Sequence, residues 1–110
     1  MSLTQKRCLP CEGFSKPFDQ IEEENYIKHI DGWTLNCKGE HRIIKKYNFA
    51  DFVNAVAFVN KIADLAENEG HHPNILIKYN LVEIELYTHA IGGLSKNDFI
   101  LAAKIDGLLK

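Results

Sequence analysis

The sequence predicts an α+β domain: a four-stranded antiparallel sheet with three helices on one face, in the order α-β-β-α-β-β-α. Two pairs of strand-like segments are the first reason, because each pair is joined by a loop short enough for an antiparallel hairpin. The second reason is the long segment 50–69 between the pairs, in which apolar residues recur at helical spacing. A shorter helical segment precedes the first pair and another follows the second, which completes the predicted order.

The size and composition of the chain are those of one soluble globular domain. It has 110 residues, of which 45% are hydrophobic and 25% are charged. The formal net charge of −2 provides no basic surface for nucleic acid. No run approaches the roughly 18 apolar residues of a membrane span, and no charged segment followed by an apolar one marks a secretory signal. We therefore expect neither a nucleic-acid partner nor a membrane.

The N-terminal residues differ from the rest of the chain. Residues 1–16 have little periodicity, and we expect them to form an extended arm ahead of a single domain at residues 17–110. The arm contains Cys8-x-x-Cys11, but a structural zinc site needs four ligands and a thioredoxin-like pair follows a strand. A structural role in the arm is therefore favoured. The three cysteines, an odd number, argue against a disulfide framework and favour a reducing, cytoplasmic setting.

The first helix and the first strand pair follow the arm. Residues 19–30 are predicted to be helical, since a capping aspartate precedes an apolar stripe. Three glutamates near the helix start complement its dipole and are expected to lie in solvent: Glu22, Glu23 and Glu24. Residues 33–37 and 42–47 are predicted strands with a glycine-containing loop between them. His29 and His41 have no pattern of partners, so we predict that both are surface residues.

The helix predicted at residues 50–69 has two apolar sides. One side carries Phe52 and Val53, and the other carries Phe58 and Ile62. Because a helix with two apolar sides has more than one partner, we expect the sheet on one side and a second subunit on the other. The sequence therefore predicts a homo-oligomer.

A second hairpin is predicted from residues 74–79 and 82–89, the latter with strict alternation of apolar and polar residues through its first part. Only Asn80 and Leu81 lie between the strands, which leaves room for a tight turn. Because Asn-Leu is a weak turn signal, a register shifted by about two residues stays open.

Three of the five histidines are expected to meet at one end of this hairpin: His71, His72 and His89. With the turn at residues 80–81, His89 lies opposite His72 and close to His71, so three imidazoles converge at one end of the hairpin. On the second strand His89 shares a face with polar residues, among them Glu85 and Tyr87. His89 therefore points away from the apolar layer, towards a surface that a ligand can reach.

The last helix is predicted to begin at Ser95, whose spacing to Asp98 is that of a capping box. A cap alone tolerates asparagine, so Asp98→Asn should then cost well under about 1 kcal/mol. Asp98 also shares a helix face with the apolar residues Leu101 and Ile105, which aims it inward. A capping role and a role in the histidine site are both open.

Convergent imidazoles favour a functional cluster over three structural histidines, and two kinds of chemistry use them. Glu67, His71 and His89 could form a catalytic zinc triad. The helical spacing of an HExxH motif is absent, however, because His71 follows the end of the helix. Imidazole also serves as an acid or a base near neutrality, since its ordinary pKa is about 6.5.

These motifs together resemble the signature of the pterin-4a-carbinolamine dehydratases. The residues that carry the resemblance are Glu67-xxx-His71-His72-Pro73, Tyr79-Asn80, Thr88-His89, Gly93-Leu94-Ser95 and Asp98. Further segments fit as well: Cys8-Leu9-Pro10-Cys11-Glu12-Gly13, Gly32-Trp33 and Phe49-xx-Phe52. The resemblance therefore covers nearly the whole chain, and the combination of motifs is specific.

The resemblance implies the dehydration of a 4a-hydroxytetrahydropterin to a quinonoid dihydropterin and water, a step in tetrahydrobiopterin recycling. It implies histidine acid/base catalysis with no metal and no cofactor. His71 and His89 would be the acid/base pair, and His72 would share in the proton transfer. His72, Thr88 and His89 would bind the pterin. Which histidine is the acid stays open. Members of the family are commonly tetramers, so a homodimer or homotetramer is expected.

The resemblance gives two carboxylates supporting roles. Glu67 and Asp98 would position and tune the imidazoles, since an adjacent carboxylate favours the imidazolium.

A second class of function stays open, a non-catalytic binding protein on the same fold. Relatives of the family serve as a dimerisation cofactor for a homeodomain transcription factor or as an assembly factor for a carbon-fixing enzyme. The three histidines and Asp98 favour the enzyme, because a scaffold has no need for convergent imidazoles. The second apolar side of the long helix would be the place for a protein partner.

Overall fold

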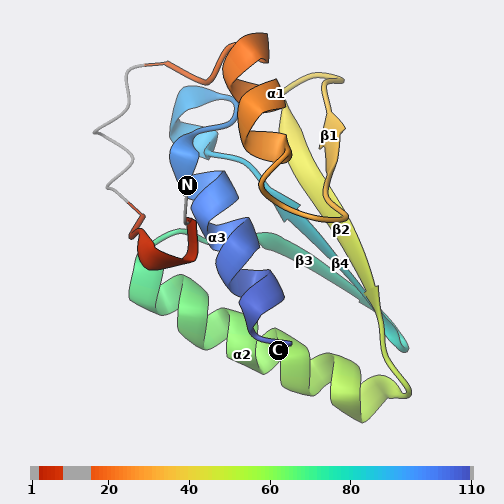
Figure 1. The fold of residues 1–110 in the computed structure, drawn as a ribbon. Coiled ribbons are helices and arrows are strands. Elements are labelled where there is room, and N and C mark those ends of the chain that lie inside the picture. Colours follow the sequence, from red (N-terminus) through yellow and green to blue (C-terminus); the bar gives the residue numbers. More distant parts are fainter. Residues whose placement is uncertain (1–2, 9–15, 110) are drawn as a thin grey trace.

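The computed structural model describes residues 3–8 and 16–109, and within them it has the predicted fold. The strands are β1 (Thr34–Asn36), β2 (Arg42–Asn48), β3 (Asn74–Lys78) and β4 (Leu81–Leu86). The helices are α1 (Gln20–Ile27), α2 (Phe52–Glu69) and α3 (Lys96–Gly107), with 3-10 turns at η1 (Leu3–Gln5) and η3 (His89–Ile91). The antiparallel sheet has the spatial order β1-β2-β4-β3, and α1, α2 and α3 lie on one of its faces (Figure 1). None of the described helices has the length and apolar content that a membrane span requires.

Local sequence signals set the helix ends. The Asp19 carboxylate accepts the Glu22 N–H at 2.9 Å and the Glu22 carboxylate accepts the Asp19 N–H at 3.0 Å, which is a complete capping box for α1. The Asp51 carboxylate accepts the Asn54 N–H at 2.8 Å and caps α2 in the same way. Gly70 ends α2 in the left-handed conformation (φ 68°), which glycine adopts without steric cost.

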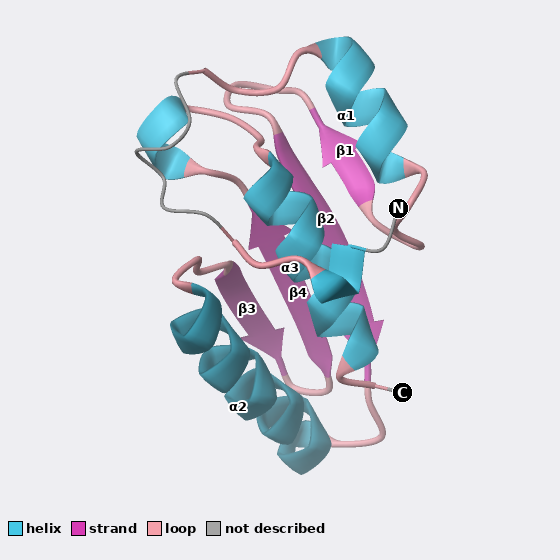
Figure 2. Cartoon of the chain, turned by 60° about the vertical axis from the view of Figure 1, so that its left-hand side comes forward, coloured by secondary structure: helices cyan, strands magenta, loops and turns pink. Residues whose placement is uncertain are grey.

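Figure 2 shows the helices as a layer over one side of the sheet, and the cluster of buried side chains is made of residues from both layers. Alternation along β4 directs Val82, Ile84 and Leu86 towards the helices, where each is 0% exposed. These side chains belong to one cluster with the aromatic and aliphatic residues Trp33, Ile43, Tyr47, Phe58, Ile62, Phe99 and Leu101. The glutamates between them, Glu83 and Glu85, face away from the helices. The predicted faces of this strand are therefore confirmed.

The register of the second hairpin differs from the expected one by two residues. Tyr79 and Asn80 form the turn, and Lys78 pairs with Leu81. Contacts from outside the hairpin hold this turn, because the Asn80 amide donates to the Phe49 carbonyl at 3.1 Å and the Phe49 N–H donates to the Asn80 carbonyl at 2.8 Å. A shift of two residues leaves every side chain on its predicted face, since side chains alternate with a period of two.

One of the three glutamates of α1 is not in solvent. Glu23 is 1% exposed, and its Oε2 lies 2.8 Å from Nδ1 of His41. The expectation of a fully solvated acidic face was therefore wrong for Glu23, because α1 packs this side against the loop between β1 and β2. His41, expected to be a surface residue without a partner, has a side chain that is 40% exposed and is bound to this carboxylate.

The N-terminal segment is tied to the domain. Instead of extended chain, Leu3–Gln5 is a 3-10 turn whose buried Leu3 joins the core beside α3. The Cys8 N–H donates to Glu69 at 2.9 Å, and Lys104 binds the same carboxylate at 2.7 Å. Burial by itself would raise the pKa of Glu69, but the hydrogen bond and charge of Lys104 lower it below its ordinary value.

Of the Cys8-x-x-Cys11 pair, the structure describes the first cysteine, Cys8. Burial, with the charge of Glu69, raises the pKa of the Cys8 thiol to about 12, so the thiol stays protonated at neutral pH. Protonated sulfur is a poor nucleophile and a poor metal ligand, which agrees with a structural role for Cys8. Cys11 lies outside the described residues.

Asp106 links the end of α3 to the sheet. Its carboxylate accepts hydrogen bonds from Nε1 of Trp33 at 3.0 Å, Nζ of Lys45 at 2.9 Å and the hydroxyl of Tyr47 at 2.6 Å. Trp33 and Tyr47 are each 6% exposed, so water cannot readily replace Asp106 as their acceptor. Burial and the bond to Asp106 together raise the pKa of Tyr47.

We expect Asp106→Ala to lower the free energy of unfolding by about 2–4 kcal/mol, because it leaves buried donors of Trp33 and Tyr47 without an acceptor. Urea unfolding followed by Trp33 fluorescence measures the loss. Asp64→Ala, a matched change at an exposed position of α2, should stay within about 0.5 kcal/mol of wild type. Equal unfolding midpoints for the two variants would contradict the linking role of Asp106.

Candidate active site

The carboxylate of Asp98 is the centre of the histidine region. It is 0% exposed and stands in the first turn of α3. Its Oδ2 accepts the Ser95 N–H at 2.9 Å, as in a capping box, and also the Thr88 hydroxyl at 2.9 Å. Its Oδ1 lies 2.6 Å from Nε2 of His71. A carboxylate only accepts hydrogen bonds, so this contact selects the His71 tautomer with its proton on Nε2 and turns Nδ1 away from Asp98.

Two short connections bring His71 and Thr88 to Asp98. After the left-handed Gly70, the N–H of His71 still bonds the Ala66 carbonyl at 3.3 Å, so the ring follows directly on the end of α2. Thr88 is held by a bridge to Gly93, with Thr88 N–H to Gly93 carbonyl at 2.7 Å. Gly93 admits no larger residue without rearrangement, because a Cβ there would lie 2.7 Å from Cβ of Pro17.

A hollow of about 220 Å³ lies next to this centre. Two imidazoles line it, those of His72 and His89, together with Asn74, Glu85 and Tyr87. The ring of His89 packs edge-on against Tyr87, with 6.1 Å between ring centroids. Since Glu85 points away from the core, the hollow lies on the side of the sheet opposite the helices.

Most of the residues predicted from sequence do lie in this region, but they divide into two groups. His72 and His89 share the hollow, whereas His71 is 5% exposed and is not among the residues that line it. Thr88, expected to bind the pterin, is 0% exposed and donates to Asp98. Oε2 of Glu67 lies 2.5 Å from Nε2 of His72, in a pair whose side chains are 78% and 60% exposed.

Three lining residues were missing from the sequence-based site: Asn74, Glu85 and Tyr87. Glu85 is held in place by the Asn74 amide at 2.9 Å and by Nε of Arg42 at 2.8 Å. The predicted strand already placed Glu85 and Tyr87 on the face of His89, and this shared face was the signal that could have identified them. Asn74 carried no such signal, because its place beside Glu85 depends on the hairpin register.

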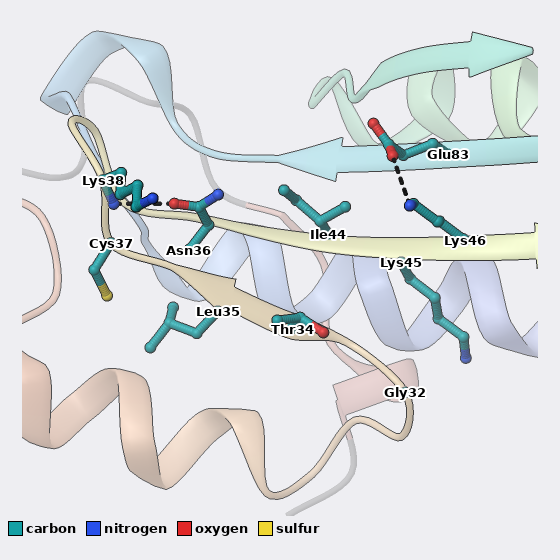
Figure 3. A pocket seen from close by; sticks show the side chains of 10 residues that line it. All are labelled: Gly32, Thr34, Leu35, Asn36, Cys37, Lys38, Ile44, Lys45, Lys46 and Glu83. Carbon is teal, nitrogen blue, oxygen red and sulfur yellow. Dashed lines mark hydrogen bonds and ion pairs between the residues drawn. The ribbon is translucent and has the colours of Figure 1, made fainter.

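A larger hollow of about 760 Å³ lies over the β1 edge of the sheet (Figure 3). Its lining combines the backbone and side chains of β1 with Ile44, Lys45, Lys46 and Glu83 and contains no histidine. We place the candidate chemistry at the smaller hollow, because of these two hollows it is the one that histidines line, and imidazole suits proton transfer near neutrality.

The fold and the site define a small α+β protein with histidines gathered at one end of an antiparallel sheet. The chain belongs to the pterin 4 alpha carbinolamine dehydratase family, whose model matches residues 16–108. This finding confirms the resemblance seen in the motifs.

Relatives match nearly the full chain. A protein of Halorhodospira halophila, named as a pterin-4-alpha-carbinolamine dehydratase, is 43% identical over 108 residues and 98% of each chain is covered. A protein of Rickettsia canadensis with the same name is 45% identical over 105 residues, with 94% of each chain covered.

Two solved structures are also similar. The transcriptional coactivator/pterin dehydratase from Brucella melitensis has a TM-score of 0.80 at 28% identity, over 86% of this chain and 100% of that one. A pterin dehydratase-like protein, described as a RuBisCO assembly factor in the alpha-carboxysome, has a TM-score of 0.61 at 27% identity over 73% of this chain and 92% of that one.

We expect Asp98→Asn to cost about 1–3 kcal/mol of stability, more than the capping pattern alone suggested. The buried carboxylate accepts three hydrogen bonds, from His71, Thr88 and the Ser95 N–H. Asparagine would replace one carboxylate oxygen with an NH2 group, which cannot accept a hydrogen bond from these partners. Thermal and urea unfolding measure the cost. Glu22→Gln is the matched control, because Glu22 holds the same capping position in α1 but is exposed, so it should cost less than about 0.5 kcal/mol. Equal costs would show that the additional partners of Asp98 contribute nothing.

Proposed function

We propose that the protein is a hydro-lyase that dehydrates 4a-hydroxytetrahydrobiopterin to quinonoid dihydropterin and water in the recycling of tetrahydrobiopterin. The observation that carries the proposal is the pairing of His71 with a buried carboxylate next to a hollow lined by His72 and His89. Family membership supports the substrate class. The free thiols of Cys8 and Cys37 suit a reducing compartment, and we propose the cytoplasm as its location.

The reaction needs one proton donor and one proton acceptor. The bond between C4a and the hydroxyl oxygen breaks as an imidazolium protonates that oxygen, and water leaves. A neutral imidazole removes the proton from N5, and the electron pair of the N5–H bond forms the new double bond to C4a. One proton is donated and one is accepted, so the protein ends with no net change in its protonation. No electrons pass to an external acceptor, so no redox cofactor is required.

We assign the two proton transfers to His71 and His89. Asp98 fixes the ring of His71 and leaves Nδ1 free, which is the orientation that a general base or acid requires. His89 faces the hollow directly. The assignment requires the pterin to reach the small part of the His71 ring that stays exposed. His72 then orients the pterin from the side, and Glu67 positions the His72 ring through its hydrogen bond.

Glu85 and Asn74 suit recognition of the pterin ring. The amino group and ring N–H of a pterin are hydrogen-bond donors, and a carboxylate held by Arg42 and Asn74 offers acceptors to them at the edge of the hollow. The histidines supply the chemistry, while these residues supply an orientation that brings C4a and N5 towards the imidazoles.

The exposed side of α2 supports a homo-oligomer, a dimer or a tetramer. Phe58 and Ile62 are buried against the core, whereas Phe52 is 51% and Val53 75% exposed. Large apolar side chains in such positions commonly mark contacts with another subunit.

A second candidate function is an assembly factor that binds another protein. Similarity to the RuBisCO assembly factor and the exposed apolar side of α2 favour it. Fold alone does not separate the two functions. The histidines and Asp98 favour catalysis, because binding by α2 makes no use of them.

Turnover of freshly generated 4a-hydroxytetrahydropterin tests the enzymatic proposal. We expect His71→Ala and His89→Ala each to lower kcat by about a hundredfold to ten-thousandfold, the range of general acid/base catalysis. His72→Ala should act mainly on KM. Asp98→Asn, which keeps the His71 imidazole, should lower kcat by about tenfold to a hundredfold.

His29→Ala serves as the control, because His29 is exposed and lies outside the site. If His72→Ala loses kcat while His71→Ala keeps it, His72 makes the second proton transfer in place of His71. Turnover absent from the folded wild-type protein would exclude the dehydratase and leave the assembly function.

We expect the protein to sediment as a dimer or tetramer and Val53→Glu to shift it to a smaller species, because a charge would have to be buried in the subunit contact. Sedimentation velocity over a range of concentrations measures this. Lys61→Glu is the control, since it also introduces a glutamate at an exposed position of the same helix, about two turns beyond Val53 and already occupied by a charged residue. A monomeric wild type at every concentration would refute the contact.

A further inference from the structure

Three potential metal ligands meet at the opposite edge of the sheet from β3. They are Glu23 on α1, Cys37 in the loop after β1 and His41 just before β2. One ligand atom from each lies within 4.8 Å of those of the other two. Oε2 of Glu23 and Nδ1 of His41 are already 2.8 Å apart. Small side-chain rotations would therefore place all three donor atoms around one ion.

The Glu23 carboxylate provides a second, independent observation. The side chain is 1% exposed, and Oε1 has no hydrogen-bond partner among the described residues. A buried carboxylate oxygen without a donor is unfavourable, because it has lost its water and gained nothing in return. The single contact with His41 satisfies only the other oxygen. A bound cation would supply the missing partner for this carboxylate.

The donor set determines the kind of cation. Thiolate, imidazole and carboxylate together suit Zn²⁺ and related transition metals, whereas Mg²⁺ and Ca²⁺ prefer oxygen ligands alone. Three protein ligands leave a fourth position for water. Cys37 is exposed, and Figure 3 shows its sulfur pointing out of the loop towards the side of α1, so an ion can enter from solvent.

We propose that Glu23, Cys37 and His41 form a binding site for one zinc-type divalent ion. The ion would connect α1 to the hairpin of β1 and β2, two parts that the bond from Glu23 to His41 already joins here. The sequence predicted no metal, and the three residues have no recognisable spacing. Glu23 reaches Cys37 and His41 because α1 packs beside the hairpin of β1 and β2.

Metal binding by the full chain tests the proposal. The reference protein carries Cys8→Ser and Cys11→Ser, which removes the thiols of the N-terminal arm. After treatment with a chelator, it is titrated with Zn²⁺ against a chromophoric competitor, and separately with Co²⁺ to record absorption. We expect one ion per chain, a thiolate-to-cobalt charge-transfer band, and a thermal midpoint that rises with added Zn²⁺.

Cys37→Ser in this reference is the decisive variant, because Cys37 is exposed and its replacement should leave the fold intact. It should abolish the charge-transfer band, weaken Zn²⁺ binding by at least about tenfold, and remove the zinc-dependent rise in thermal midpoint. Glu23→Gln and His41→Ala should weaken binding as well. The matched controls Glu24→Gln and His29→Ala, both at exposed positions nearby, should bind like the reference.

Three results would overturn the proposal. The first is a reference protein that binds no zinc at stoichiometric concentrations. The second is binding that survives Cys37→Ser unchanged. The third is binding that disappears with His72→Ala and His89→Ala instead, which would place the ion at the hollow described above.

Discussion

The buried carboxylate of Asp98 is the constraint on which the candidate site depends. It joins the end of α2, through His71, to the connection after β4, through Thr88, and to the start of its own helix, through the Ser95 N–H. Each partner is a donor, and together they satisfy a charge that would be costly to bury alone. The bond to His71 also fixes which ring nitrogen faces Asp98, namely Nε2. One side chain therefore stabilises the packing of three segments and also orients the proposed catalytic imidazole.

The alternation of β4 divides the molecule into a core and a site. Val82, Ile84 and Leu86 face the helices, while Glu85 and Tyr87 extend towards the hollow that His72 and His89 also line. A strand with one buried face has a strongly specified orientation, because a shift of one residue would bury its glutamates. Hydrophobic burial thus fixes the direction of the site residues, and Tyr87 itself packs against the core.

The fold does not separate the functions for which the similar structures are named. The compared structures include one described as a transcriptional coactivator/pterin dehydratase and one described as an assembly factor, on a shared architecture. In this chain the pairing of His71 with Asp98 favours proton transfer, and the exposed Phe52 and Val53 favour a protein contact. The two features lie on different elements, so one does not exclude the other.

The sequence by itself determined the fold class and the faces of β4, because helical and strand periods and capping residues act over a few neighbouring positions. The tertiary structure alone decided which residues from distant segments meet. It set the hairpin register through the contacts of Asn80 with Phe49, buried Glu23 against His41, and placed Asn74 beside Glu85. These outcomes depend on how α1 and α2 pack on the sheet, and such packing contacts have no periodic signature in the local sequence.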